Sequence, residues 1–298
     1  MNLDAELSAL AVQDDLPADL VRRLLHHPTA RRSAALLRRD LTVESIEEII
    51  RLGSMRSLAA NAHVPAAVRA RLAEQPEPEV RAAVAASAAD DPPGLLARLA
   101  DDPDPFVRSF LAMNELLPAE ILAVLATDTE PSVRANVVTY GRHVPESVRR
   151  ALLMDSDPEV RRRAASVYSP PADLLPGLLA DPETRAVAAR HADPSAELVG
   201  DPDPGVRRAV AAHPHLSAEL RDVLASDADP FVRNAIAARP DTPSTLRESL
   251  VAGLATDDPL TEWFLSFGRN THACPPRAAA PPRFTREQAE ELITRAGL

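Results

Sequence analysis

A Val-Arg pair, or its equivalent, recurs along this chain at intervals of 22 to 27 residues. Such a period, combined with helical spacing of apolar residues, indicates helical repeats that are each too small to bury their apolar side alone. It predicts an all-α chain, a solenoid of stacked two-helix repeats with a ribbon-like core. The arginines of these pairs, here called marker arginines, are Arg81, Arg108, Arg134, Arg161, Arg185, Arg207 and Arg233.

Proline punctuates the predicted helices. The chain holds 29 Pro and only 9 Gly, and many prolines fall in phase with the repeat. Asp157-Pro158 and Asp201-Pro202 precede marker arginines, where Asp can accept hydrogen bonds from free helix N–H groups and Pro lacks one. The second helix of a repeat opens similarly, as at Pro118 and Ser217. Only 3% of residues are aromatic, so Leu, Val and Ala must fill the core.

The repeat resembles that of a known family. Asp201–Leu224, DPDPGVRRAVAAHPHLSAELRDVL, and Asp102–Leu125 are similar to repeats of the leucine-rich repeat variant family, relatives of HEAT-like repeats, and the resemblance spans residues 15–256. It implies a right-handed superhelix of alternating α and shorter α or 3-10 helices, without strands, and a binding or scaffolding role. Some members carry an N-terminal cysteine cluster for an iron–sulfur centre. The only cysteine here is Cys274, so we expect no cofactor.

The pattern divides the chain into segments. The Pro- and Ala-rich stretch near the end predicts an extended linker, and Thr285 with Gln288 forms a capping-box match that opens a last amphipathic helix. That helix needs an apolar surface, from this chain or another. The predicted segments are capping helices at 1–30, repeats at 31–256, a C-terminal cap with the only Trp at 257–270, a linker at 271–284 and a helix at 285–298.

Regularity fails between residues 168 and 205. The two shortest marker intervals, 24 and 22 residues, lie here, and the second helix near Ser195–Val199 has room for little more than one turn. Shortened repeats change the local twist of a solenoid, so we expect a bend or a notch.

Charge argues against several classes of partner. The formal net charge is −11 and all basic residues are Arg, so long-range repulsion disfavours nucleic acid and anionic membranes unless charge is segregated onto one face. No apolar run approaches the roughly 18 residues of a membrane span, and the acidic N-terminus lacks a signal-like start, which predicts a cytoplasmic protein. His26-His27 and the His213–His215 pair lack the partners of a metal site, so no metal is expected.

Two sets of residues are candidates for binding. The marker arginines could form a ladder for an acidic ligand, although pairing with acidic groups or helix ends of the neighbouring repeat is the favoured interpretation. Six residues after each marker the first helix ends, and Asn61 and Asn114 at such places can satisfy a helix end. Other residue types there predict a binding strip on one surface, comprising Tyr140, His191, His213 and Arg239, flanked by Tyr168 and His215.

We therefore expect a non-catalytic scaffold that binds a protein or peptide on the concave face of the solenoid. One alternative is a small-molecule enzyme or accessory protein with a pocket at the irregular repeats 168–215, which a closed pocket holding several His and Tyr side chains would favour. A further alternative is a HEAT-like DNA glycosylase, which needs a basic groove with aromatics and a carboxylate. The sequence contains no motif that assigns catalytic residues.

Overall fold

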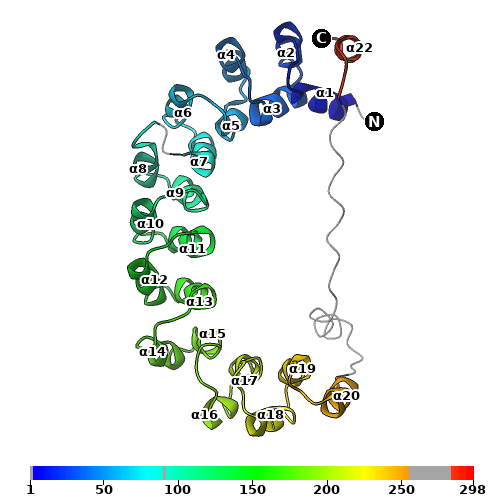
Figure 1. The fold of residues 1–298 in the computed structure, drawn as a ribbon. Helices are drawn as coiled ribbons and strands as arrows, with labels where there is room; N and C mark the ends of the chain where they lie inside the picture. The colour runs from blue at the N-terminus through cyan, green and yellow to red at the C-terminus, as the bar shows by residue number, and fades with distance from the viewer. Residues whose placement is uncertain (1–2, 90–91, 255–282) are drawn as a thin grey trace. The chain divides into compact units, whose positions relative to one another are not determined.

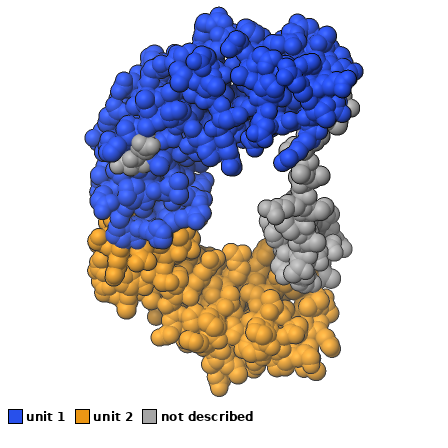
Figure 2. Space-filling view, turned by 45° about the horizontal axis from the view of Figure 1, so that its top comes forward, with its two compact units in different colours: residues 1–145, 277–298 blue, residues 146–276 orange. Residues whose placement is uncertain are grey.

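The computed structural model describes residues 3–89, 92–254 and 283–298. Within these ranges the chain forms twenty-one α-helices and no strand, so the all-α prediction is confirmed. The chain divides into two compact units, residues 1–145 with 277–298 (unit 1) and residues 146–276 (unit 2) (Figures 1 and 2). The second unit is thus inserted between two pieces of the first along the chain.

Within each unit the helices alternate between two rows (Figure 1). Consecutive helices of the first row pack side by side within their unit. In unit 1 the first row is α1 (Leu3–Ala11), α3 (Pro28–Leu37), α5 (Met55–Ala59), α7 (Pro78–Ser87), α9 (Pro105–Ala112) and α11 (Pro131–Tyr140). In unit 2 it is α13 (Pro158–Val167), α15 (Arg185–Ala188), α17 (Pro204–Ala211) and α19 (Pro230–Ala238).

The second row consists of short α-helices. No 3-10 helix occurs among the described residues. The second-row helices are α2 (Ala18–Leu24), α4 (Val43–Arg51), α6 (Ala66–Leu72), α8 (Leu95–Ala100) and α10 (Ala119–Leu125) in unit 1, and α12 (Glu146–Leu153), α14 (Leu175–Ala180), α16 (Ala196–Val199), α18 (Ala218–Leu224) and α20 (Ser244–Ala252) in unit 2.

Asp-Pro pairs start the first-row helices α9, α13, α17 and α19, although α17 begins at Asp203-Pro204 and not at the expected Asp201-Pro202. At α19 the Asp229 carboxylate accepts hydrogen bonds from the N–H groups of Phe231 and Val232, and Pro230 occupies the first helical position. Asp157 does the same for α13. These bonds satisfy donors that the helix itself leaves free, which fixes where each first helix begins.

Apolar side chains from neighbouring helices build the core. In unit 2 Val206, Val210, Val232 and Ile236 are fully buried where α17 and α19 meet, and Leu224 of α18 joins them. Because Val, Leu and Ala dominate this cluster, the helices approach closely without large aromatic side chains.

The last helix, α22 (Arg286–Arg295), packs on α1 and α2 of the same chain. Its Ala289, Leu292 and Ile293 are buried, and the predicted capping box is present. The Gln13 amide also donates to the Phe284 carbonyl at 2.9 Å and accepts from the Phe284 N–H at 2.7 Å. The apolar surface that covers this helix therefore belongs to the same chain.

Several of the expected segments can be located in the structure. Helix α16 has only four residues, which confirms the shortened second helix. Helix α3 runs across the boundary expected at residue 30. The expected cap at 257–270 and all but the last two residues of the expected linker at 271–284 lie outside the described residues. Among the helices of the described ranges, none has the length and apolar character to cross a membrane.

Candidate functional site

Four of the marker arginines form a bidentate link from their own repeat to the next. Arg207 on α17 donates from Nε and Nη2 to the two carboxylate oxygens of Asp227, at 2.7 and 3.0 Å, in the loop before α19. Its Nη1 donates backwards to the carbonyls of Asp201 and Pro202 at 2.8 and 3.2 Å. Equivalent carboxylate pairs are Arg81–Asp102, Arg108–Asp128 and Arg161–Asp181. Pairing with the neighbouring repeat, the favoured interpretation of these residues, is confirmed for these four.

Each of these aspartates also shapes its own loop. Asp227 Oδ1 accepts from the Asp229 N–H at 2.8 Å, two residues on. The hydrogen bond from Arg207 is the main cause that lowers the pKa of Asp227, against the opposing effect of burial. The same bond raises the pKa of Arg207. Both groups are therefore ionised at neutral pH and committed to each other.

The link is weaker where the repeats shorten. Arg185 approaches Asp201 only to 3.5 Å, and its Nε donates to the Leu179 carbonyl at 2.8 Å. Asp201 follows its marker by 16 residues, whereas Asp227 follows Arg207 by 20. Since α16 is short, the acidic partner arrives earlier in the chain and the bidentate geometry is lost.

The position six residues after the marker closes the first helix of the preceding repeat. Asn114 donates from Nδ2 to the carbonyls of Ala85 and Ala88 at 3.0 and 2.7 Å, and its Oδ1 accepts from the Leu116 N–H at 3.0 Å. Asn61 makes the same three bonds to its own surroundings. Both residues are buried, so the amide satisfies helix-end carbonyls that have no water contact.

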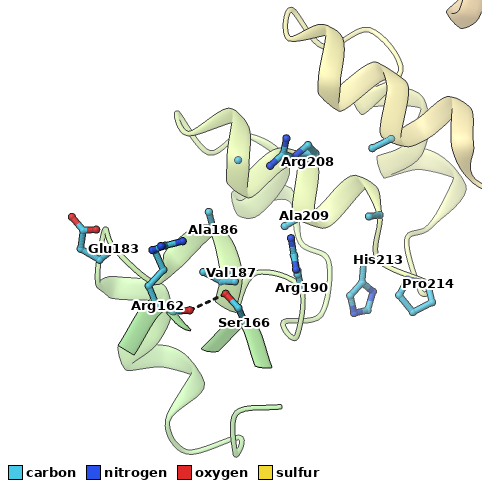
Figure 3. Close-up of a pocket in the computed structure, with 13 residues that line it drawn as sticks. Arg162, Ser166, Glu183, Ala186, Val187, Arg190, Arg208, Ala209, His213 and Pro214 are labelled. Carbon is cyan, nitrogen blue, oxygen red and sulfur yellow. Dashed lines mark hydrogen bonds between the residues drawn. The ribbon is translucent and has the colours of Figure 1, made fainter. Parts of the chain in front are cut away.

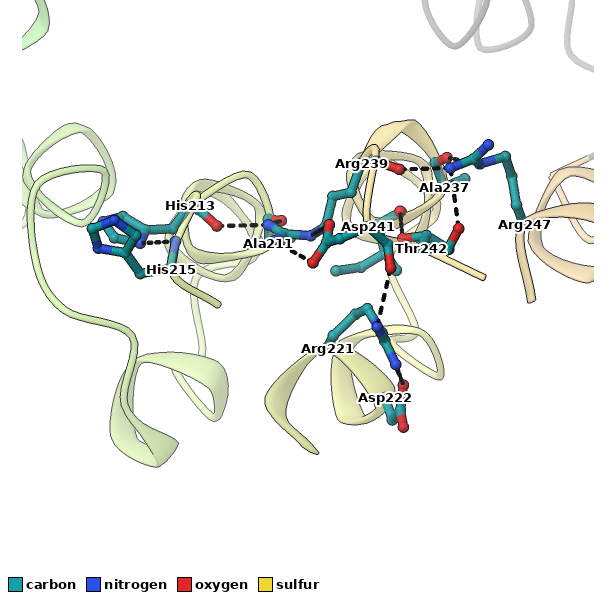
Figure 4. Close-up of polar contacts among 11 residues, drawn as sticks. Ala211, His213, His215, Arg221, Asp222, Ala237, Arg239, Asp241, Thr242 and Arg247 are labelled. Carbon is teal, nitrogen blue, oxygen red and sulfur yellow. Dashed lines mark hydrogen bonds and ion pairs between the residues drawn. The ribbon is translucent and has the colours of Figure 1, made fainter. Parts of the chain in front are cut away.

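Arg239, a predicted binding residue, also donates hydrogen bonds to helix-end carbonyls of the preceding repeat, with a guanidinium in place of an amide. Its Nη1 donates to the carbonyls of Ala211 and His213 at 2.9 and 2.6 Å, while Nε and Nη2 pair with Asp241 (Figure 4). Only 6% of Arg239 is exposed. Its guanidinium is thus held inside the scaffold, facing helix-end carbonyls.

His213 lies at the same position after its marker arginine and accepts the backbone hydrogen bond that Asn accepts there. Its Nδ1 accepts from the N–H of His215 at 3.2 Å, as the Asn oxygen does elsewhere, and the two imidazole rings lie edge to face at 5.5 Å. The proton of a neutral ring must then sit on Nε2. Burial, with a smaller effect of His215, lowers the pKa of His213. His191 is exposed and acts on His213 through its charge.

The two tyrosines lie at the ends of first-row helices. Tyr140 ends α11 in unit 1 and is half-buried, whereas the other predicted site residues belong to unit 2. Tyr168 follows α13, and its hydroxyl is buried without a hydrogen-bond partner among the described residues. Burial raises its pKa to about 12. Within unit 2 the structure therefore joins His213 directly both to His215 and to Arg239.

An open groove runs over the first-row helices of unit 2. It has a volume of about 630 Å³ and crosses α13, α15, α17 and α19. Figure 3 shows Arg162, Arg190 and Arg208 around it, with His213 at one end. The surface between them is made of small or short residues, namely Ala186, Val187, Gly205, Ala209, Ala212 and Ala235.

Unit 1 carries a groove on the same row of helices. It has a volume of about 720 Å³ and crosses α3, α5, α7 and α9. Arg32 and Arg56 line it together with Leu36 and Phe110, and serines and alanines fill the remaining surface. Each unit thus presents the exposed side of its first-row helices as a shallow channel with arginines.

Sequence reasoning did not single out the arginines of these grooves. Arg32, Arg162 and Arg208 directly follow Arg31, Arg161 and Arg207, and Arg56 follows Met55, which takes the marker position. Successive residues of a helix point about 100° apart, so the second arginine of each pair faces a different side from the first. An arginine directly after a marker position was therefore the sequence signal that could have predicted a side chain facing away from the repeat link.

No protein-family model matches the chain, and no curated protein matches it. Within the described residues, no group of three or more His, Cys, Asp or Glu side chains could hold a metal ion.

Proposed function

We propose that the protein is a right-handed α-solenoid of the HEAT-like kind that acts as a binding scaffold, and that a protein or peptide segment docks on the first-row helices. The groove of unit 2 carries the proposal. Its walls and floor come from four consecutive first-row helices, and Arg162, Arg190, Arg208 and Ala212 in its lining are exposed. An open channel of this kind suits an extended chain rather than an enclosed small molecule.

The floor of the groove supports docking of a backbone. Ala186, Gly205, Ala209 and Ala235 keep the surface low, so a bound segment can lie close to the helices. The scaffold beneath is preformed by buried cores and by the Arg–Asp links, so little ordering is required on binding.

The alternative of a small-molecule enzyme or accessory protein gains less from the structure. In the region 168–215 the residues His213 and Arg190 line the open groove, while the Tyr168 hydroxyl is buried on its own. A DNA glycosylase would need aromatic side chains and a carboxylate within a basic groove. The unit 2 groove has one carboxylate, Glu183, and no aromatic residue other than His213 in its lining.

A groove-filling substitution tests the proposal. Ala212 is exposed in the unit 2 groove, so Ala212→Trp adds bulk there without altering the core. We expect selection of a displayed random peptide library on the protein to yield peptides that bind the wild type and lose affinity for Ala212→Trp. Ala238→Trp, at an exposed residue outside the groove lining, is the matched control. Peptides that bind both variants alike would contradict docking in this groove.

A further inference from the structure

The grooves hold arginines whose charge the protein leaves unpaired. Among the described residues, the side chains of Arg190 and Arg208 in unit 2 and of Arg32 and Arg56 in unit 1 have no hydrogen-bond or ion-pair partner. The marker arginines behave in the opposite way, since Arg81, Arg108, Arg161 and Arg207 each engage an aspartate. Two kinds of arginine therefore coexist, in one case as the chain neighbours Arg207 and Arg208, and only one kind serves the fold.

The lining of each groove carries more positive than negative side chains, although the whole chain is acidic. The unit 2 groove is lined by three arginines and one acidic residue, Glu183. Arg162, the third arginine, already pairs with Glu159 at 2.6 Å. The unit 1 groove is lined by two arginines and no acidic residue. In a chain of formal net charge −11, this is charge segregation onto one row of helices.

We infer that the segment bound in these grooves is an acidic peptide, in which Asp or Glu carboxylates meet the unpaired guanidinium groups. This inference rests on the proposed docking function and specifies its partner. A guanidinium presents a planar fork that matches a carboxylate with two parallel hydrogen bonds. The small floor residues between the arginines leave room for the peptide backbone.

The spacing of the arginines specifies the partner further. Arg32 on α3 and Arg56 on α5 occupy equivalent positions in adjacent first-row helices. Packed helices lie roughly 8–10 Å apart, and an extended chain advances roughly 3.3 Å per residue. Acidic residues about three positions apart would therefore reach both arginines. Arg190 and Arg208 also belong to adjacent repeats, those of α15 and α17.

The two grooves differ in their apolar content. The unit 1 groove includes Leu36 and Phe110, and the Leu36 side chain is exposed. The apolar lining of the unit 2 groove includes alanines and Val187, without Leu or Phe. Unit 1 should thus prefer acidic peptides that also carry an apolar residue between or beside the carboxylates.

Nucleic acid fits these observations less well. A polyanion is repelled by the overall charge at long range, and single strands are usually held by aromatic stacking, which the unit 2 groove lacks. Two unpaired arginines per groove suit a few discrete carboxylates better than a continuous phosphate backbone.

The test uses the full chain and defined probes. Peptides from a displayed random library selected on the wild type should be enriched in Asp and Glu, with pairs about three positions apart. A synthetic nine-residue peptide from that selection is then titrated by fluorescence anisotropy, beside its version with Glu replaced by Gln. The double variant R190Q/R208Q or R32Q/R56Q should weaken binding by roughly tenfold, as expected for a few exposed ion pairs. Arg149→Gln and Arg39→Gln remove exposed arginines outside both groove linings and should leave Kd unchanged.

The outcomes separate this inference from the proposed function. If the selected peptides are neutral or basic, and lose affinity for Ala212→Trp or for Ala86→Trp in unit 1, the acidic partner is overturned. Docking in the groove is then retained. An oligonucleotide that binds more tightly than every selected peptide, and depends on the same arginines, would overturn the peptide in favour of nucleic acid. Selected peptides that neither tryptophan variant affects would overturn both proposals.

Discussion

Arg207 of one repeat and Asp227 of the next repeat are joined by two parallel hydrogen bonds, 2.7 and 3.0 Å long. The aspartate side chain is 7% exposed and the arginine side chain 17%. The arginine also holds the Asp201 carbonyl at 2.8 Å, so one side chain connects the loop before its own helix with the loop before the next. Removing either partner leaves the other partly buried and without its opposite charge.

Arg207→Gln should therefore destabilise the protein by about 1.5–3 kcal/mol, the range for losing a hydrogen bond to a charged group. Urea denaturation followed by circular dichroism measures the effect. Asp227→Asn and the double variant complete a thermodynamic cycle, in which we expect a coupling energy above about 0.5 kcal/mol because the residues touch. Strictly additive losses would show that the pair contributes nothing beyond each residue's separate contacts.

The same pair makes stability depend on pH in acid. The pKa of Asp227 is lowered in the folded protein, so the folded state binds this proton less readily than the unfolded chain. Its contribution is present above the ordinary Asp value of about 3.9 and is lost as the pH falls through the folded-state pKa. The difference in unfolding free energy between the wild type and Asp227→Asn should hold from pH 7 to 5 and shrink below about pH 4. A difference that grows in acid would contradict this assignment.

Asn114→Ala tests the helix-end position. The substitution leaves the buried carbonyls of Ala85 and Ala88 without their donor. We expect a loss of about 1–3 kcal/mol in urea denaturation. Asn234 is half-buried on α19 and has no side-chain hydrogen bond among the described residues, so Asn234→Ala is the matched control and should change stability by less than about 0.5 kcal/mol. Equal effects of the two substitutions would contradict a specific role for the Asn114 amide.

His213 should show a low pKa and a defined tautomer. Because burial lowers its pKa, the ring loses its proton more readily than a free imidazole, and because Nδ1 accepts from the His215 N–H, the proton of the neutral ring lies on Nε2. Long-range ¹H–¹⁵N NMR spectra over a pH titration report both properties, and His213→Gln identifies the signal. The folded state resists protonation here, so this residue reduces stability as the pH falls below about 6.5. A Nδ1–H tautomer would refute the hydrogen-bond assignment.

The helix α22 should detach from α1 and α2 when a buried apolar side chain of α22 is replaced by a smaller one. Ile293 is fully buried against the N-terminal helices, so Ile293→Ala removes contacts that hold α22 in place. Faster tryptic cleavage after Arg286 and Arg295 would reveal the release. Glu291→Ala, at an exposed residue of the same helix, should leave the cleavage rate unchanged.

The sequence predicted the scaffold better than its surface. The marker arginines recur with Asp nearby, and opposite charges at a fixed period predict their pairing, as Arg161 and Asp181 show. Arg207 and Arg208 are indistinguishable by type, yet the helix turns one toward an aspartate and the other toward the groove. Arg239 reaches helix-end carbonyls that Asn114 reaches with a shorter side chain, an equivalence that residue type does not indicate.

The last helix shows a different limit. Its capping box and apolar side could be predicted from local spacing, because both depend on residues within one or two turns. Its partner could not be, because Gln13 and Phe284 are 271 residues apart in the chain. A pattern within one helix specifies that an apolar surface must be covered, but not which distant segment covers it.

The attachment of α22 to α1 and α2 has a consequence for biosynthesis. Unit 1 is assembled from residues on both sides of unit 2, so a ribosome must translate all of residues 146–276 before α22 exists to complete it. At roughly 5–20 residues per second, the first helices wait some tens of seconds for this partner. During that interval the nascent chain exposes the apolar surface that Leu292 and Ile293 later cover, and this is the stage at which a chaperone would have most to protect.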